Sequence, residues 1–303
     1  QELAIQVCKQ IDILCKNSEL PYSSLFLIGD GNINRQIDSL KTKPSIVVGT
    51  PARILQLIKM KKLRVHDVKF LIIDEADRLI DKTYYESVIT IRKSLMKYTQ
   101  ILMFSASIDK KTRKTANQLA YNPVFLDISK DTNEKDIIPK TIKHYYIISD
   151  RRERIETLRK IIKAGKPEKA MIFINSRYDL EESLQKLQYH NYNVGSLSGN
   201  SDKFSKRNAI NDFKDGRISY LLATDVAARG LQIDNVDMVI NVNLPEDSKE
   251  YLHRAGRCGR NEHTGICISI ITENELNKIK QYQKQFNINI VARKLYNGKL
   301  VAK

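Results

Sequence analysis

Two short clusters of charged residues have types and spacing that suit phosphate chemistry. The first, residues 74–77, reads Asp-Glu-Ala-Asp and directly follows the apolar run at 70–73. In open α/β sheets, ligands bind beyond the carboxyl ends of strands, where a carboxylate can hold Mg²⁺ on a nucleotide. Asp74 is therefore the candidate metal carboxylate, and Glu75 the candidate that orients or deprotonates an attacking water. The alternative is an acidic helix N-terminus stabilised by the helix dipole.

The second cluster, residues 253–260, holds one histidine and three arginines within eight positions. Arg257 and Arg260 are three positions apart, so on a helix or a turn they share one face. Paired guanidinium groups on one face can stabilise the charge that develops on a phosphoryl group during its transfer. The alternative is a basic patch that is solvated, or one that contacts RNA phosphates only.

Short apolar runs alternate with amphipathic stretches along the chain, which predicts parallel sheets covered by helices. In the first part the predicted strands are 24–28, 45–48, 68–73, 101–104 and 124–126. After a polar stretch the pattern restarts, with predicted strands at 170–174, 194–197, 220–223, 238–242 and 267–271. We therefore predict two α/β lobes, residues 1–130 and 141–303, joined by a linker at 131–140. The short basic tail, 289–303, could extend contact with RNA or fray, and we expect it to fray.

The composition indicates a polyanionic partner. Lys and Arg total 51 against 35 Asp and Glu, a formal net charge of +16, which suits nucleic acid or an acidic membrane surface. No apolar run approaches the roughly 18 residues of a membrane span. The four cysteines form no C-x-x-C pair and have no histidine at zinc-ligand spacing, so we expect reduced thiols, no zinc site and a cytoplasmic location.

Taken together, the motifs resemble those of the DEAD-box ATP-dependent RNA helicases over nearly the whole chain. Residues 74–77 match the motif that names the family, and 253–260 match its His-Arg-x-Gly-Arg-x-Gly-Arg motif. Further similar stretches are found at 1–6, 50–53, 105–107 and 223–230. Five or six such matches in the order and spacing of the family leave little room for chance. The fold that this resemblance implies is two tandem RecA-like lobes, each a mostly parallel sheet flanked by helices.

The resemblance implies an enzyme that uses ATP and Mg²⁺ to close two lobes on RNA and to open short duplexes. The implied catalytic residues are Asp74 and Glu75, which also hold the metal, together with Arg257 and Arg260. Arg257 and Arg260 would also contact ATP, together with Gly230 and Gln232. The implied coupling residues are Asp77, Ser105, Ser107 and His253. The implied RNA contacts are Gly29, Thr50, Arg53, Ser176, Arg177, Gly199, Arg207 and Thr224. These groups suit backbone and 2′-OH contacts, so we expect a monomeric core with little preference for RNA sequence.

The chain departs from the family pattern at several positions. Asp30 stands where the family has a second glycine beside the RNA, and Phe204 replaces a glutamine. Gln232 occupies the position of the aspartate that holds the ATP ribose. No G-x-x-x-x-G-K-[ST] loop occurs to hold the ATP phosphates. In the family this loop precedes the position of Gln1, so we interpret it as missing from this chain and not lost in evolution.

Two other functions stay open on the sequence. The first is a non-catalytic RNA-binding clamp, which the absent loop and Gln232 favour and which Glu75, Arg257 and Arg260 oppose. The second is a superfamily 2 helicase that acts on DNA, against which the Asp-Glu-Ala-Asp spelling argues through the resemblance alone. Measuring whether single-stranded RNA or DNA stimulates ATP hydrolysis would distinguish the RNA helicase from these two alternatives.

Overall fold

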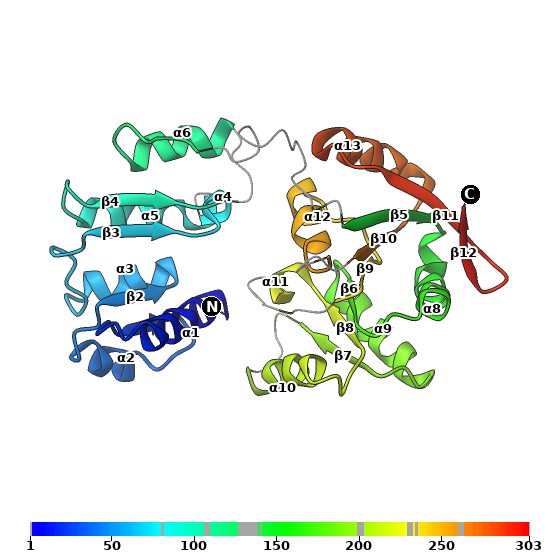
Figure 1. The fold of residues 1–303 in the computed structure, drawn as a ribbon, viewed down its shortest axis with the longest axis horizontal. Coiled ribbons are helices and arrows are strands. Elements are labelled where there is room, and N and C mark those ends of the chain that lie inside the picture. The colour runs from blue at the N-terminus through cyan, green and yellow to red at the C-terminus, as the bar shows by residue number, and fades with distance from the viewer. Residues whose placement is uncertain are drawn as a thin grey trace. The chain divides into compact units, whose positions relative to one another are not determined.

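The computed structural model describes residues 2–79, 82–105, 110–126, 139, 141–198, 203–228, 233, 236–259 and 264–302. Internal contacts divide the chain into two compact units, unit one at 1–126 and unit two at 127–303 (Figure 1). The linker predicted at 131–140 lies outside the described residues apart from Pro139. The lobe boundaries drawn from the sequence therefore stay predictions.

Unit one contains two pairs of parallel strands. One pair is β1 (Ser24–Leu27) with β2 (Ile46–Gly49), and the other is β3 (Phe70–Ile73) with β4 (Gln100–Met103). The helices are α1 (Glu2–Asn17), α2 (Ile33–Leu40), α3 (Pro51–Lys59), α4 (Ala76–Leu79), α5 (Lys82–Ser94) and α6 (Lys110–Leu119). Parallel neighbours need a crossover between them, and helices of the unit supply it: α2 between β1 and β2, and α4 with α5 between β3 and β4. A small core around the second pair holds Ile73, Ala76, Val88 and Leu119.

The strand predicted at 124–126 is wrong. This segment has no regular secondary structure, and Val124 and Leu126 are 84% and 78% exposed. A strand is stable when a neighbour satisfies its backbone N–H and C=O groups. In the described part of unit one, no strand pairs with this segment, so its apolar composition alone does not make it a strand.

Unit two is built on one sheet of eight strands in the order β12-β11-β5-β10-β9-β6-β8-β7. Every neighbouring pair is parallel except β11 and β12. The strands are β5 (Ile142–Ile148), β6 (Ala170–Phe173), β7 (Val194–Leu197), β8 (Tyr220–Ala223), β9 (Met238–Asn241), β10 (Gly265–Ile271), β11 (Ile290–Tyr296) and β12 (Lys299–Ala302). The helices are α8 (Arg154–Gly165), α9 (Arg177–Tyr189), α10 (Lys203–Lys214), α11 (Asp225–Ala228), α12 (Ser248–Ala255) and α13 (Leu276–Phe286).

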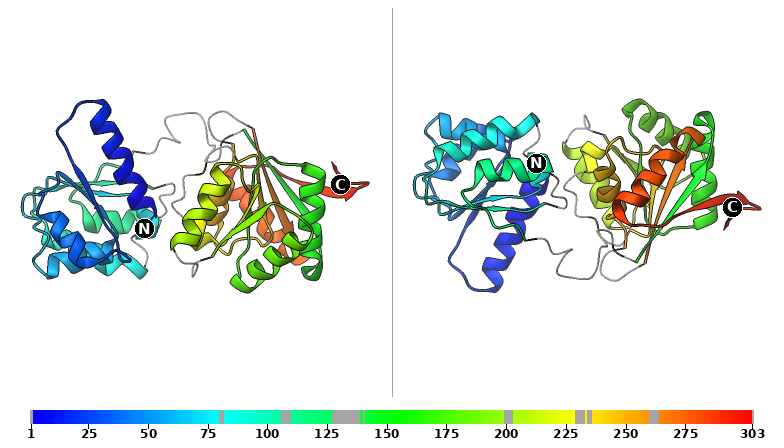
Figure 2. Two further views of the ribbon diagram at one scale, coloured as in Figure 1. Left: turned by 90° about the horizontal axis from the view of Figure 1, so that it is seen from below. Right: turned by 90° about the horizontal axis from the view of Figure 1, so that it is seen from above.

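Helices cover both sides of this sheet, as the two views in Figure 2 show. The strand β6 is buried along its whole length, and its side chains alternate between two apolar clusters. Met171 and Phe173 belong to one cluster, whereas Ala170 and Ile172 belong to the other. This is the two-residue period of a strand that is buried on both faces, and it explains why β6 reads as an unbroken apolar run.

The expectation that the basic tail frays is wrong. Strand β11 pairs in parallel with β5 and then turns into the antiparallel strand β12. Asn297 and Gly298 have φ values of 46° and 71°, the two positive values that a tight two-residue hairpin turn requires. Leu295 and Leu300 pack against the apolar cluster beneath α8. Among the described residues, no helix is both long and apolar enough to cross a membrane.

We predict that His144 makes unit two sensitive to acid. The side chain is buried, its Nδ1 lies 2.8 Å from the Tyr251 hydroxyl oxygen, and burial lowers its pKa to about 4. The unfolded chain binds this proton near pH 6.5, so it holds more protons than the folded chain below that pH. The free energy of unfolding should therefore fall between pH 6.5 and 4, by roughly 2–3 kcal/mol from this residue.

The measurement is chemical denaturation of the wild type and of His144→Gln, which keeps a hydrogen-bond partner for Tyr251, at pH 7 and at pH 4.5. Other titrating groups affect both proteins equally, so the difference between the two curves isolates the imidazole. The wild type should lose more stability than the variant on acidification. Equal losses would show that the imidazole does not control the pH dependence.

Candidate functional site

The acidic cluster of unit one lies at the carboxyl end of β3, where the chain turns into α4. Asp74 is exposed and Glu75 is half-buried. Glu75 has a φ of 48°, a left-handed conformation that is uncommon for a residue with a side chain. The Asp74 carboxylate accepts a hydrogen bond from the Glu75 backbone N–H at 2.8 Å. The turn therefore keeps two carboxylates at the edge of the sheet where ligands bind.

Backbone hydrogen bonds join this turn to the neighbouring strand β4. The Phe104 N–H donates to the carbonyl of Ile73, and the Ala76 N–H donates to the carbonyl of Phe104, both at 2.9 Å. The Asp77 N–H then donates to the Ser105 hydroxyl at 3.3 Å. The structure thus brings together Asp77 and Ser105, two of the predicted coupling residues. A third, Ser107, lies outside the described residues.

Of the RNA contacts predicted in unit one, Arg53 is bound to the protein itself. It is 8% exposed, and its guanidinium donates to the backbone carbonyls of Gly29 and Gly31. Thr50 precedes α3, and its N–H donates to the carbonyl of Leu27 at 3.0 Å. Arg53 therefore holds the loop around Gly29 against α3. Direct contact between these residues and RNA stays a prediction.

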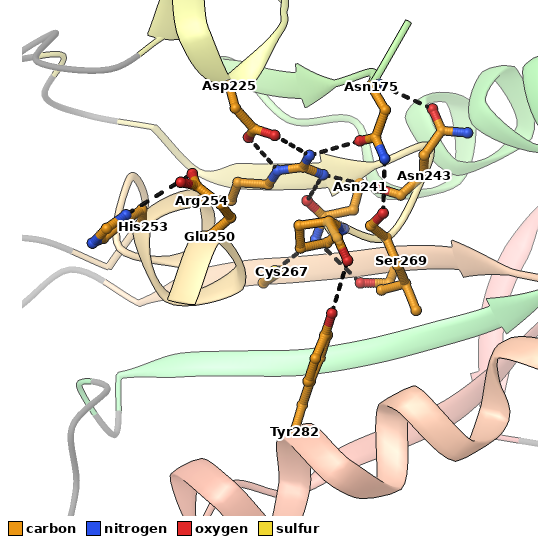
Figure 3. A network of polar contacts seen from close by, with 12 residues as sticks. Asn175, Asp225, Asn241, Asn243, Glu250, His253, Arg254, Cys267, Ser269 and Tyr282 are labelled. Carbon is orange, nitrogen blue, oxygen red and sulfur yellow. Dashed lines mark hydrogen bonds and ion pairs between the residues drawn. The ribbon is translucent and has the colours of Figure 1, made fainter. Parts of the chain in front are cut away.

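The arginine cluster of unit two contains one buried guanidinium, that of Arg254 (Figure 3). Arg254 is 1% exposed, and its Nε and one Nη donate to the two carboxylate oxygens of Asp225 at 2.6 and 2.7 Å. The same Nη donates to the side-chain oxygen of Asn175 at 2.7 Å. The other Nη donates to the carbonyl of Asn243 at 2.8 Å and to the side-chain oxygen of Asn241 at 3.2 Å. The bidentate pair and the added acceptors give the buried cation the partners that it needs.

The partners of Arg254 adjoin residues that were predicted to contact RNA. Asn175 directly precedes Ser176, and Asp225 directly follows Thr224. These partners come from the ends of β6, β8 and β9, while Arg254 itself lies in the last turn of α12. One side chain therefore fixes three strand ends against the helix that leads to Arg257. Sequence reasoning noticed Arg254 within its motif but assigned it no role, because its burial is not visible in the sequence.

The remaining predicted residues of unit two occupy separate positions around this network. The Ser176 hydroxyl caps α9 by accepting from the Asp179 N–H, and Arg207 is exposed on α10. The Nδ1 of His253 lies 3.9 Å from the Glu250 carboxylate, and Arg257 is half-buried just after α12. The side chain of Arg177 is outside the described residues, as are Gly199, Gly230, Gln232 and Arg260.

We predict that the pair of Arg254 and Asp225 is needed for the stability of unit two. Arg254→Met leaves the Asp225 carboxylate without its cation, and breaking a buried pair in this way costs about 3–5 kcal/mol in the free energy of unfolding. Replacing both partners, as Arg254→Met with Asp225→Leu, should cost less than the single change because no unpaired charge remains. Chemical denaturation of the three proteins measures these differences.

The matched control is Arg217→Met. Arg217 also pairs with two carboxylates, those of Asp212 and Asp215, but its side chain is 60% exposed. Exposed pairs contribute about 0–1 kcal/mol, so the control should be nearly as stable as the wild type. If both arginine variants lost the same free energy of unfolding, burial of the pair of Arg254 and Asp225 would not explain its contribution to stability.

Comparisons with known proteins match both units. The model of the DEAD/DEAH box helicase family matches residues 1–115, and that of the helicase conserved C-terminal domain matches residues 153–262. The DEAD-box ATP-dependent RNA helicase CshC of Bacillus cereus is 33% identical over 301 residues, which are 99% of this chain and 75% of that protein. The probable ATP-dependent RNA helicase YfmL of Bacillus subtilis is 35% identical over 303 residues, 100% of this chain and 78% of that protein.

A solved structure extends the likeness to the fold. S. cerevisiae Dbp5 bound to RNA and ADP BeF3 matches with a TM-score of 0.84 and 26% identity, over 96% of this chain and 75% of that chain. The predicted fold of two RecA-like lobes is thereby confirmed. Because the matches run through the acidic and the arginine clusters alike, this chain belongs to the DEAD-box family of ATP-dependent RNA helicases.

Proposed function

We propose that this protein couples ATP binding and hydrolysis to closure of its two units on RNA, and so to the opening of short duplexes. The observation that carries this proposal is the turn at the end of β3. There an exposed Asp74, a Glu75 held at positive φ, and the link from Asp77 to Ser105 lie together. The two bacterial relatives, one named a DEAD-box ATP-dependent RNA helicase and one a probable ATP-dependent RNA helicase, support it.

The residues at this turn fit a hydrated Mg²⁺ on ATP. Magnesium prefers oxygen ligands and keeps several waters, so the Asp74 carboxylate, with Glu75 beside it, suffices to hold it. When bound, the metal neutralises charge on the phosphates. Glu75 orients the attacking water or accepts its proton. Asp77 and Ser105 transmit the state of the nucleotide from β3 to β4, with Ser107 and His253 as the other predicted coupling residues.

In unit two, Arg257 and Arg260 stabilise the charge that develops on the transferred phosphoryl group. Gly230 and Gln232 contact the rest of the nucleotide, and the glutamine amide offers the ribose a hydrogen bond without charge assistance. These roles are supported by the place of Arg257 just after α12. The buried Arg254 holds that helix to the ends of β6, β8 and β9.

The proposed RNA contacts are spread along the sequence over segments that come after strands. Unit one offers Gly29 and Thr50, and Arg53 acts by holding the Gly29 loop. Unit two offers Ser176, Arg177, Gly199, Arg207 and Thr224. Small hydrogen-bonding groups of this kind suit the sugar–phosphate backbone, so RNA of any sequence should bind.

The two alternatives have less support. A non-catalytic clamp would need neither the carboxylate of Glu75 nor the two arginines Arg257 and Arg260. A DNA helicase has less support because both bacterial relatives are named as RNA helicases. ATP hydrolysis by the complete gene product, measured with single-stranded RNA and with DNA, tests the choice, and stimulation by DNA alone would contradict the proposal.

We predict that Arg257→Ala in the complete gene product lowers ATP turnover about a thousandfold, the usual scale for an arginine finger. Binding of RNA without nucleotide should change far less. Steady-state ATPase assays and an RNA titration measure the two effects, with the exposed Arg217→Ala as the control of equal charge change. Loss of RNA binding with ATPase retained would make Arg257 an RNA contact.

We also predict that residues 1–303 by themselves bind RNA weakly and do not hydrolyse ATP. Phosphoryl transfer depends here on positioning and charge neutralisation, and the sequence contains no G-x-x-x-x-G-K-[ST] loop to hold the β- and γ-phosphates. The assay compares this chain with a longer form that carries such a loop upstream of Gln1. RNA-stimulated hydrolysis by the short chain, abolished by Glu75→Gln, would overturn the prediction.

A further inference from the structure

The last 28 residues of the chain, 276–303, contain seven basic residues and no acidic residue. They therefore carry a charge of +7, a large share of the net +16 of the protein. The basic residues are Lys278, Lys280, Lys284, Arg293, Lys294, Lys299 and Lys303. Except for the last, which is outside the described residues, they lie on α13 and on the hairpin of β11 and β12.

Some surface cations on other helices of unit two are paired with acids. Arg159 pairs with Glu156 on α8, and Lys186 pairs with Glu182 on α9. By contrast, α13 uses only lysine, glutamine and asparagine as polar residues, and its three lysines and the two of the hairpin are exposed. None of these five lysines forms an ion pair with a described residue. The segment therefore carries a positive charge with no acid of its own. Of the two acids that directly precede it, Glu275 pairs with Arg154.

The hairpin places an aromatic ring between two of these lysines. Tyr296 is 62% exposed and lies directly opposite Lys299 in the antiparallel register. Lys294, two residues earlier on the same strand, points to the same face of the hairpin. Positive groups beside an exposed aromatic ring are the combination with which proteins bind single-stranded nucleic acid, by phosphate attraction and by stacking on bases.

The opposite face of the hairpin is anchored to unit two. Leu295 and Leu300 pack into the apolar cluster shared with α8, and the Arg293 guanidinium lies over the Tyr145 ring, 4.6 Å from its centroid. The turn at Asn297 and Gly298 has the backbone that a tight hairpin requires. The exposed Lys-Tyr-Lys face is thus presented on a fixed platform, seen in red beside the C-terminus in Figure 1.

This face is distinct from the RNA contacts proposed above. Those contacts follow β6, β7 and β8, which lie at one side of the sheet, whereas β11 and β12 form the opposite edge. Three strands separate β11 from β6, which is about 19 Å at the usual strand spacing. An RNA bound at the ends of β6, β7 and β8 would reach the hairpin of β11 and β12 only by extending across unit two.

We propose that Lys294, Tyr296 and Lys299, with the lysines of α13, form a second RNA-binding surface. It holds the backbone of RNA that extends beyond the segment bound at the ends of β6, β7 and β8. This inference rests on the proposed RNA helicase function. An anionic membrane would also be attracted to the lysines, but the exposed ring between them favours unpaired bases.

The test uses the complete gene product with Lys294→Gln and Lys299→Gln combined, and a single-stranded RNA long enough to cross unit two. Each lost phosphate contact lowers the slope of log affinity against log salt by about 0.7, so the double variant should lose about 1.4. Tyr296→Ala should weaken binding of the long RNA about tenfold, the scale of one lost base stack. Binding of a short RNA, and its stimulation of ATP hydrolysis, should not change.

The control is Lys160→Gln with Lys163→Gln, which removes the same charge from exposed positions on α8. Equal salt slopes for wild type and hairpin variant, or equal loss in the control, would overturn the inference. So would variants that keep RNA affinity but no longer bind vesicles of anionic lipid, because the surface would then serve a membrane. If the wild type bound no RNA at all, the proposed function itself would fail.

Discussion

Unit two depends on the burial of one positive charge. The guanidinium of Arg254 has almost no contact with water, so each of its N–H groups must find an acceptor within the protein. Its acceptors come from Asp225, Asn175, Asn241 and Asn243, which end or follow three different strands. The three strands must be in register for the guanidinium to reach all of its acceptors. The hydrogen bonds of Arg254 therefore specify the relative positions of these strands more strictly than apolar packing could.

Unit one achieves a similar result with backbone groups. The turn after β3 is joined to β4 through Ile73, Phe104 and Ala76, and the Ser105 hydroxyl continues this ladder to the N–H of Asp77. These hydrogen bonds therefore transmit a displacement of the acidic turn to β4. Strain at Glu75 is tolerated because these bonds hold the residues on either side.

Local pattern predicted the strands that are buried on both faces. β7 and β8 begin and end at the predicted residues. For β8 the reason is its apolar run, Tyr-Leu-Leu-Ala, which leaves few other choices. The local pattern failed where pairing with a neighbouring strand decides whether a segment forms a strand. The run at 124–126 is apolar but forms no strand. The basic tail that was expected to fray forms a hairpin, because a neighbouring strand and an Asn-Gly turn are available.

The sequence by itself determined the chemistry of this protein: carboxylates after a strand, arginines grouped within eight residues, and an excess of positive charge all follow from residue type and spacing. Tertiary structure decided which of those charges are buried against acceptors of the protein itself. Arg53 and Arg254 belong to the same motifs as the proposed functional residues, yet both are buried against protein acceptors. Spacing cannot reveal this, because the desolvation of a side chain depends on residues that are distant in the sequence.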